Sequence, residues 1–171
     1  IQGGLVERVG GASKGPARVA KEFKPAAAPV AAGNGPIPVS IPPFTPPVQR
    51  RELAITALAA SPNAPLAAAA GLEHIKLIHT GKREPIGALA FPEGIPNVLR
   101  FSRDGSILLA AGGRGMKLGK VVLYDVKTGK RLGEYGDDID EILAADISPD
   151  LKLVAFGGPG KLVKVHDTKD G

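Results

Sequence analysis

The stretch "FSRDGSILLAAGG" at residues 101–113 predicts a strand, a tight turn and a second strand. Residues 147–158, "ISPDLKLVAFGG", have nearly the same arrangement of apolar residues, turn residues and glycines. A weaker copy, "ASPNAPLAAAAG", occupies residues 60–71. The copies begin 41 and 46 residues apart, which indicates one supersecondary unit that recurs along the chain.

Short apolar runs cut by turn residues predict four strands in each of the first two units and three in the third. The predicted strands are residues 55–61, 66–71, 75–80 and 85–91, then 97–102, 106–113, 120–126 and 130–136, then 142–148, 152–158 and 162–168. Alternation in "KVVLYDV" and "KLVKVHDT" gives Val121, Leu123, Val163 and Val165 the same parity, and we expect these side chains to face inward.

Turn chemistry supports these strands. In "SRDG" and "VKTGK", Gly105 and Gly129 stand where a hairpin needs a positive φ. Asp125 and Asp167 end the third strands of their units. We expect each carboxylate to accept hydrogen bonds from backbone N–H groups two or three residues on, which is a structural role.

A four-stranded unit that repeats every forty to fifty residues is typical of a propeller blade, whose small sheet buries its faces only against neighbouring blades. The sequence therefore predicts an all-β chain with about three blades, at residues 53–91, 92–136 and 137–171. The third blade should lack its fourth strand, because the sequence stops inside the turn that would lead to it.

Residues 1–52 form a separate region that contains nine of the 16 prolines within its first 50 residues. Proline cannot donate a backbone hydrogen bond and keeps its predecessor extended. We predict a Pro/Ala-rich linker here, preceded by a short helical remnant at "IQGGLVERVGG". Residues 24–50 should lack regular secondary structure and pack poorly against the repeats.

The stretches "SRDGSILLAAGG…GKVVLYDVKTGKRL" and "SPDLKLVAFGG…KLVKVHDTKDG" resemble WD40-type repeats. They share an S-x-D turn, a second strand of small residues and an apolar third strand that ends in Asp. More narrowly, residues 53–171 resemble the propellers of planctomycete-type bacterial proteins, many of which place the propeller after a c-type cytochrome domain and a Pro-rich linker. That resemblance implies an incomplete WD40-like propeller, an exported or periplasmic location and haem in an upstream domain.

The chain departs from the WD40 pattern in two ways, and it lacks the haem motif of the cytochrome domain. No Gly-His pair precedes a first strand, and Ile78, Tyr124 and His166 occupy the usual Trp position, so the hydrogen-bond tetrad of standard blades cannot be assembled. The chain has no cysteine, so the haem motif Cys-x-x-Cys-His is absent and no haem ligand is carried over to any residue. We expect no cofactor in this segment.

The net charge of +5 does not indicate a nucleic-acid partner. Residues 1–50 carry six basic and two acidic side chains, whereas the remaining residues carry 16 and 15, so the repeats are almost neutral. A nucleic-acid groove needs basic residues gathered on the folded surface, usually with stacking aromatics. No apolar run is long enough to span a bilayer, so we expect no membrane span in this segment.

Several motifs resemble phosphate-binding, calcium-binding or metal-binding sites, but the spacing of their residues does not match those sites. "GGRGMKLGK" at residues 112–120 lacks the glycine spacing and the Ser or Thr of a phosphate loop. "GDDIDE" at residues 136–141 lacks the glycine and the alternation of a calcium loop. The histidines show no metal-ligand spacing, and the serines at residues 61, 102 and 148 each open a turn. We expect no catalytic or metal site.

Arg100 and Asp146 lie two residues before the turn serines of the second and third units, in strands that are otherwise apolar. First strands of neighbouring blades lie side by side near the propeller axis. We predict that the two charges face each other across the blade interface. The alternative is that each points into a wet central channel.

These observations predict a non-catalytic scaffold for another protein, or for an upstream domain of the same polypeptide. The alternative is an accessory or docking domain of a c-type cytochrome polypeptide, with haem carried upstream. A propeller enzyme with polar residues around the axis is the third possibility.

Overall fold

A computed structural model describes residues 35–38, 41 and 54–169 of the chain. Eleven strands and no helix lie within these residues. The expected helical remnant and most of the expected linker, including Pro42 and Pro46, fall outside the described residues.

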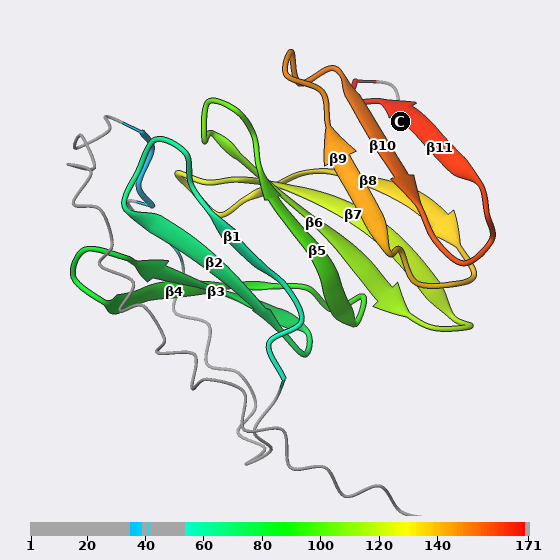
Figure 1. Ribbon diagram of the computed structural model, residues 1–171, viewed down its shortest axis with the longest axis horizontal. Coiled ribbons are helices and arrows are strands. Elements are labelled where there is room, and N and C mark those ends of the chain that lie inside the picture. The colour runs from blue at the N-terminus through cyan, green and yellow to red at the C-terminus, as the bar shows by residue number, and fades with distance from the viewer. Residues whose placement is uncertain (1–34, 39–40, 42–53, 170–171) are drawn as a thin grey trace, which may run out of the picture. The chain divides into compact units, whose positions relative to one another are not determined.

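The strands form three antiparallel sheets in which each strand pairs with its neighbour in sequence (Figure 1). Blade 1 contains β1 (Leu58–Ala60), β2 (Leu66–Gly71), β3 (His74–His79) and β4 (Glu84–Ala90). Blade 2 contains β5 (Ile95–Phe101), β6 (Ile107–Arg114), β7 (Leu118–Asp125) and β8 (Arg131–Asp138). Blade 3 contains β9 (Ala144–Ile147), β10 (Leu153–Gly157) and β11 (Val163–Asp167). The predicted pattern of four, four and three strands is confirmed.

Strand β1 is shorter than predicted, because residues 55–57 are not strand. The Thr56 hydroxyl instead donates to the Pro96 carbonyl across the blade interface, at 2.6 Å. The prediction that Val163 and Val165 face inward is wrong. Both are largely exposed, since their parity turns them away from blade 2 and no described sheet packs on that side.

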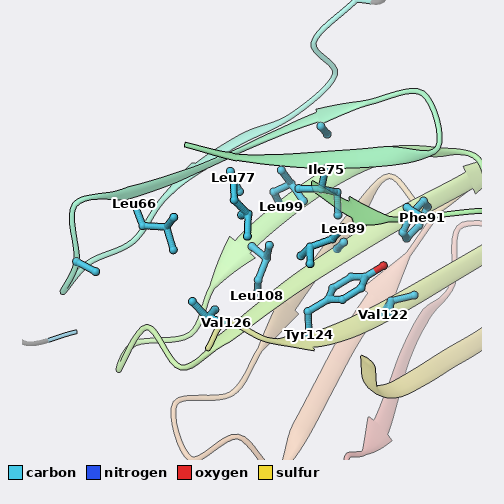
Figure 2. Packing of buried hydrophobic residues seen from close by; sticks show 14 residues of the cluster. Leu66, Ile75, Leu77, Leu89, Phe91, Leu99, Leu108, Val122, Tyr124 and Val126 are labelled. Atoms are coloured by element: carbon cyan, nitrogen blue, oxygen red, sulfur yellow. The ribbon is translucent and has the colours of Figure 1, made fainter. Parts of the chain in front are cut away.

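The first hydrophobic cluster joins blade 1 to blade 2 (Figure 2). Small side chains on β2, such as Ala68 and Ala70, let the larger side chains of the facing sheet approach. Tyr124 is 1% exposed and donates its hydroxyl to the Ala90 carbonyl at 2.7 Å. Burial raises the pKa of this phenol, so Tyr124 remains a neutral donor.

The second cluster joins the other face of blade 2 to blade 3. Phe156 and Val154 of β10 pack here against Val121 and Leu123 of β7. The Tyr135 hydroxyl donates to the Thr168 carbonyl at 2.8 Å. Blade 2 is therefore buried on both faces and holds the other two together.

Residues 35–38 and Ile41 have no regular secondary structure. The Gly35 N–H donates to the Asn63 carbonyl at 2.8 Å, and the Ile41 side chain packs on the first cluster, against Gly87 and Gly129. The expectation of poor packing before the repeats is therefore wrong at Ile41, because an aliphatic side chain between the prolines finds an apolar site.

The repeated Ser-x-Asp turns carry the same hydrogen bonds. In blade 2 the Ser102 hydroxyl donates to Asp104 at 2.6 Å and accepts the Ile107 N–H at 2.9 Å. In blade 3 Ser148 donates to Asp150 at 2.6 Å and accepts the Leu153 N–H at 2.9 Å. The serine hydroxyl bonds lower the pKa of both carboxyls.

Candidate functional site

The loops between strands fall into two sets, because consecutive antiparallel strands run in opposite directions. Loop face 1 consists of the β2–β3, β4–β5, β6–β7, β8–β9 and β10–β11 connections, residues 72–73, 91–94, 115–117, 139–143 and 158–162. Loop face 2 consists of residues 61–65, 80–83, 102–106, 126–130 and 148–152. The two sets lie at opposite ends of the sheets (Figure 1).

Exposed large apolar side chains distinguish the two loop faces. Loop face 1 carries Leu72, Met116, Ile139, Leu143 and Leu162. Met116 is 85% exposed, Ile139 78% and Leu162 68%. The fully described loops of loop face 2 hold no large apolar side chain with comparable exposure. Apolar side chains gathered on one face, with charged neighbours, are a feature of protein-interaction surfaces.

Polar contacts between blades tie the loops of loop face 1 together. Arg114 pairs with Glu73, joining the β6–β7 hairpin to the β2–β3 turn. The Met116 N–H donates to Asp140 Oδ1 at 3.1 Å, which fastens the tip of that hairpin to the β8–β9 connection. The exposed apolar side chains are thus presented from restrained loops.

Asn97 occupies a bulge in β5, between the paired residues Pro96 and Val98. Its amide donates to Glu141 Oε2 at 2.9 Å and to the Ile142 carbonyl at 3.2 Å. A bulge re-aims one side chain, and here it fixes the connection that leads into blade 3. Sequence reasoning missed this role, although Pro96, directly before the predicted strand at residues 97–102, was a signal for an irregular pairing.

An interblade cleft of about 400 Å³ opens beside this connection. It is lined by residues 137–141 from blade 2 and its exit, and by Gly158, Pro159, Gly160, Leu162 and Lys164 from blade 3. Lys164 pairs with Asp138 across it. Sequence reasoning treated "GDDIDE" as a solvated loop, and the structure places it on the wall of a cleft.

A half-buried polar cluster lies between blades 1 and 2. Glu93 of the β4–β5 loop is 9% exposed and pairs with Arg131, which also lies 5.9 Å from the centre of the Tyr124 ring. Burial opposes the Arg131 charge, but the Glu93 hydrogen bond and the nearby Tyr124 and Glu134 outweigh it and raise the arginine pKa. The cluster contains no nucleophile with an adjacent base, so we assign it to blade packing.

The residues predicted to shape turns lie at turns. Asp125 accepts hydrogen bonds from the N–H groups of Lys127 and Thr128, at 3.4 and 3.1 Å, and Asp167 accepts one from Lys169 at 2.8 Å. Gly105 and Gly129 have φ of +75° and +70°. These contacts close hairpins and bring no chemical groups together.

The predicted pairing of Arg100 with Asp146 is wrong. Both side chains are exposed, and no ion pair or hydrogen bond joins them. Leu99 packs in the first cluster, so Arg100 points to the blade 3 side of its sheet, whereas Ala145 packs in the second cluster, so Asp146 points away from blade 2. Equivalent positions in successive blades face the same way and cannot face each other.

Arg100 lines a second cleft of about 520 Å³ between β1 and β5, together with residues 57–60 and 97–101. Its walls come from the innermost strands of blades 1 and 2. The Arg100 side chain is exposed, and its orientation into a wet central channel stays a prediction.

Within the described residues, no group of three or more His, Cys, Asp or Glu side chains is placed to hold a metal ion. His166 stacks on Phe156 with ring centres 5.2 Å apart, so it serves packing. No helix in the described part of the chain is long and apolar enough to cross a membrane.

Comparison with solved structures places this arrangement in a known architecture. The β-propeller domain of Myceliophteria thermophila Cps50 (Swd1) matches 70% of this chain with a TM-score of 0.61 and 20% sequence identity. The fold is a partial WD40-like β-propeller. The match covers 36% of that neighbour, so the chain spans about a third of its length.

At this level of identity the likeness concerns the fold alone. No protein-family model matches the chain. A search of curated proteins found no relative.

Proposed function

We propose that this chain is a non-catalytic scaffold that binds another protein through loop face 1. The observation that carries the proposal is the asymmetry of the two loop faces: five exposed large apolar side chains gather on one and none on the other, within the described residues. Propeller blades form a rigid support whose loops can vary without disturbing the core. Restrained loops also lose less conformational entropy on binding, which favours affinity.

The proposal assigns no catalytic residue and no cofactor to this segment. The partial WD40-like fold is one on which interaction surfaces are common, but a fold alone does not determine an activity. The support for a non-enzymatic role is that no Ser, Cys or Lys nucleophile stands beside a base in a motif with catalytic spacing.

A finer proposal places the segment in a larger multidomain polypeptide that includes an upstream c-type cytochrome domain, which the propeller would dock or orient. The support is the resemblance of residues 53–171 to propellers with that arrangement. The test is direct: the reading frame upstream of Ile1 should encode Cys-x-x-Cys-His, and the expressed longer protein should show haem absorbance. An upstream frame without that motif would leave only the scaffold.

Site-specific photo-crosslinking tests the scaffold proposal. A benzophenone amino acid replaces Met116 on loop face 1, and in a matched protein it replaces Lys127, which is also exposed but lies on loop face 2. We expect a discrete crosslinked partner from the Met116 position only. The partner, once identified and purified, should bind Met116→Ser about tenfold more weakly than wild type, as is typical for an apolar contact at an interface centre.

Equal crosslinking from both positions, or unchanged affinity of the purified partner for Met116→Ser, would contradict the assignment of loop face 1. Circular dichroism of each variant, compared with wild type, confirms that the fold is kept.

A further inference from the structure

The interblade cleft differs in charge from the rest of the molecule. Four carboxylates line it, from Asp137, Asp138, Asp140 and Glu141, against a single cation, Lys164. The whole chain has a net charge of +5. Most of that excess lies in residues 1–50, whereas residues 51–171 carry 16 basic and 15 acidic side chains. A negative cleft in these almost neutral repeats attracts cations and repels phosphates and acidic chains.

The carboxylates of the cleft are held in place before any partner arrives. Asp140 Oδ1 accepts the N–H groups of Met116 and Glu141, at 3.1 and 2.9 Å. Glu141 Oε2 accepts the Asn97 amide at 2.9 Å. Each of these acceptors keeps a second carboxylate oxygen for another donor. Because the groups are already oriented, little side-chain entropy is lost when a cation binds.

One cation already occupies part of the cleft. The Lys164 ammonium reaches from β11 across the cleft to Asp138. This contact shows that a lysine side chain from an extended strand can enter and find a carboxylate. The Asp137 side chain is 93% exposed, and its one ion pair among the described residues is with the Lys120 ammonium, at 3.4 Å.

Apolar surface lies beside these charges. Ile139 of the β8–β9 connection and Leu162 of the β10–β11 connection both line the cleft, and both are mostly exposed to water. Exposed aliphatic side chains on a cleft lined by fixed carboxylates match a segment that carries both amines and aliphatic groups. Charge alone would not explain their exposure.

We propose that the interblade cleft binds an extended basic segment of a protein partner, in which Lys or Arg side chains bond the carboxylates and an aliphatic side chain packs on Ile139 and Leu162. This inference rests on the proposed scaffold function and specifies the chemistry of its partner. The partner's basic residues would lie at alternate positions, because alternate side chains of an extended chain share one face.

Binding of a synthetic peptide to the full chain tests the proposal. The probe is fluorescein-labelled Gly-Lys-Leu-Lys-Val-Lys-Gly, followed by fluorescence anisotropy at low salt. We expect saturable binding that weakens as salt rises, because exposed ion pairs are screened. The same peptide with Glu in place of each Lys should not bind. A basic peptide that shows no saturation up to about a millimolar concentration would overturn the proposal.

Charge-matched variants locate the binding site. Asp137→Asn with Asp140→Asn removes two charges from the cleft while keeping the Oδ1 acceptor that holds Met116. We expect the affinity to fall about tenfold, since each exposed ion pair contributes up to about fivefold. Glu84→Gln with Asp146→Asn removes two exposed charges elsewhere and should change the affinity less than about twofold. Equal losses in both double variants would overturn the proposal.

A second pair of variants tests the apolar contribution to peptide binding. Ile139→Ser should weaken binding of the peptide several-fold, whereas Leu132→Ser, at an exposed position on β8 outside the cleft, should leave it unchanged. These experiments distinguish failure of the cleft proposal from failure of the scaffold proposal. If the Met116 position captures a partner whose affinity ignores the cleft variants, the scaffold stands and the cleft assignment is wrong.

Discussion

At the scale of single residues, blade contacts depend on which face of a strand a side chain takes. Arg131, the first residue of the fourth strand of blade 2, meets Glu93 of the β4–β5 loop between blades 1 and 2. Arg100 and Asp146 occupy equivalent places in their blades and therefore point the same way. Because the blades repeat one arrangement, side chains at equivalent positions cannot pair with each other. Side chains at non-equivalent positions, such as Glu93 and Arg131, can pair.

The contrast between these two pairs is measurable by double-mutant cycles in urea. We expect a coupling free energy of about 1–3 kcal/mol for Glu93→Gln with Arg131→Met, since Glu93 is almost wholly buried and the two groups are in contact. For Arg100→Ala with Asp146→Ala we expect less than about 0.5 kcal/mol, because exposed, unpaired charges do not interact measurably. A larger coupling at the second pair would restore the pairing predicted from sequence.

The Ser-x-Asp turns predict a dependence of stability on pH. Hydrogen bonds from Ser102 and then Ser106 place the folded-state pKa of Asp104 below its ordinary value of 3.8. A carboxyl with a lowered folded pKa stabilises the fold above the unfolded pKa, and that contribution is lost as pH falls through the folded pKa.

We therefore expect Asp104→Asn to make the free energy of unfolding less dependent on pH below about 4. In the wild-type protein, carbon-13 NMR should show the Asp104 carboxyl titrating below pH 3.8, and Ser102→Ala should move that titration upward. An unchanged titration in Ser102→Ala would refute the assigned cause.

At the scale of strands and sheets, the sequence predicted all eleven strands, because each is a short apolar or alternating run bounded by turn residues. The prediction extended strand β1 too far, over residues 55–57, where the Thr56 N–H donates to the Ala70 carbonyl and its hydroxyl donates to Pro96 of the neighbouring blade. The interblade cleft was not predicted, since strand periodicity does not encode how the connections of neighbouring blades lie beside each other.

The asymmetry of the loop faces could have been found from the sequence. Loops of antiparallel strands alternate between the two ends of a sheet, so sorting the predicted loops into odd and even sets separates Leu72, Met116 and Ile139 from the polar turns. The exposure of those side chains could not have been found in this way, because it depends on how neighbouring blades cover each loop.

Close packing of strand β7 against the β8–β9 connection provides a test at this scale. A Cβ on Gly119 would stand 2.1 Å from the Asp140 carbonyl oxygen, whereas a Cβ on Gly160 would meet no atom within 4 Å. We expect Gly119→Ala to cost about 2 kcal/mol or more, since backbone must move, and Gly160→Ala to change stability by less than about 0.5 kcal/mol. Similar urea midpoints for the two variants would show that the contact is not tight.

At the scale of the whole described unit, the three sheets pack in series, and only blade 2 is covered on both faces. The outer face of blade 3 presents Leu153, Val163 and Val165 to water, and β11 has an unpaired edge within the described residues. Exposed apolar strands with open edges favour association between molecules.

We therefore expect the isolated 171-residue chain to self-associate, with a sedimentation coefficient that rises with concentration. Val163→Thr with Val165→Thr keeps β-branched residues on the strand and should reduce that rise. Leu132→Thr, an exposed position on another strand, should leave it unchanged. A monomeric wild-type chain at all concentrations would mean that these side chains are protected in solution.

The pairing of each strand with its sequence neighbour also has a consequence for synthesis on the ribosome. Every hydrogen-bonded partner of a strand in blade 1 has been translated by residue 90, before blade 2 emerges. Blade 1 can thus form its sheet while the rest is still being made, and at about 5–20 residues per second the following blade arrives within seconds. Each new blade then covers the apolar face of the one before, so the nascent chain exposes one such face at a time as it grows.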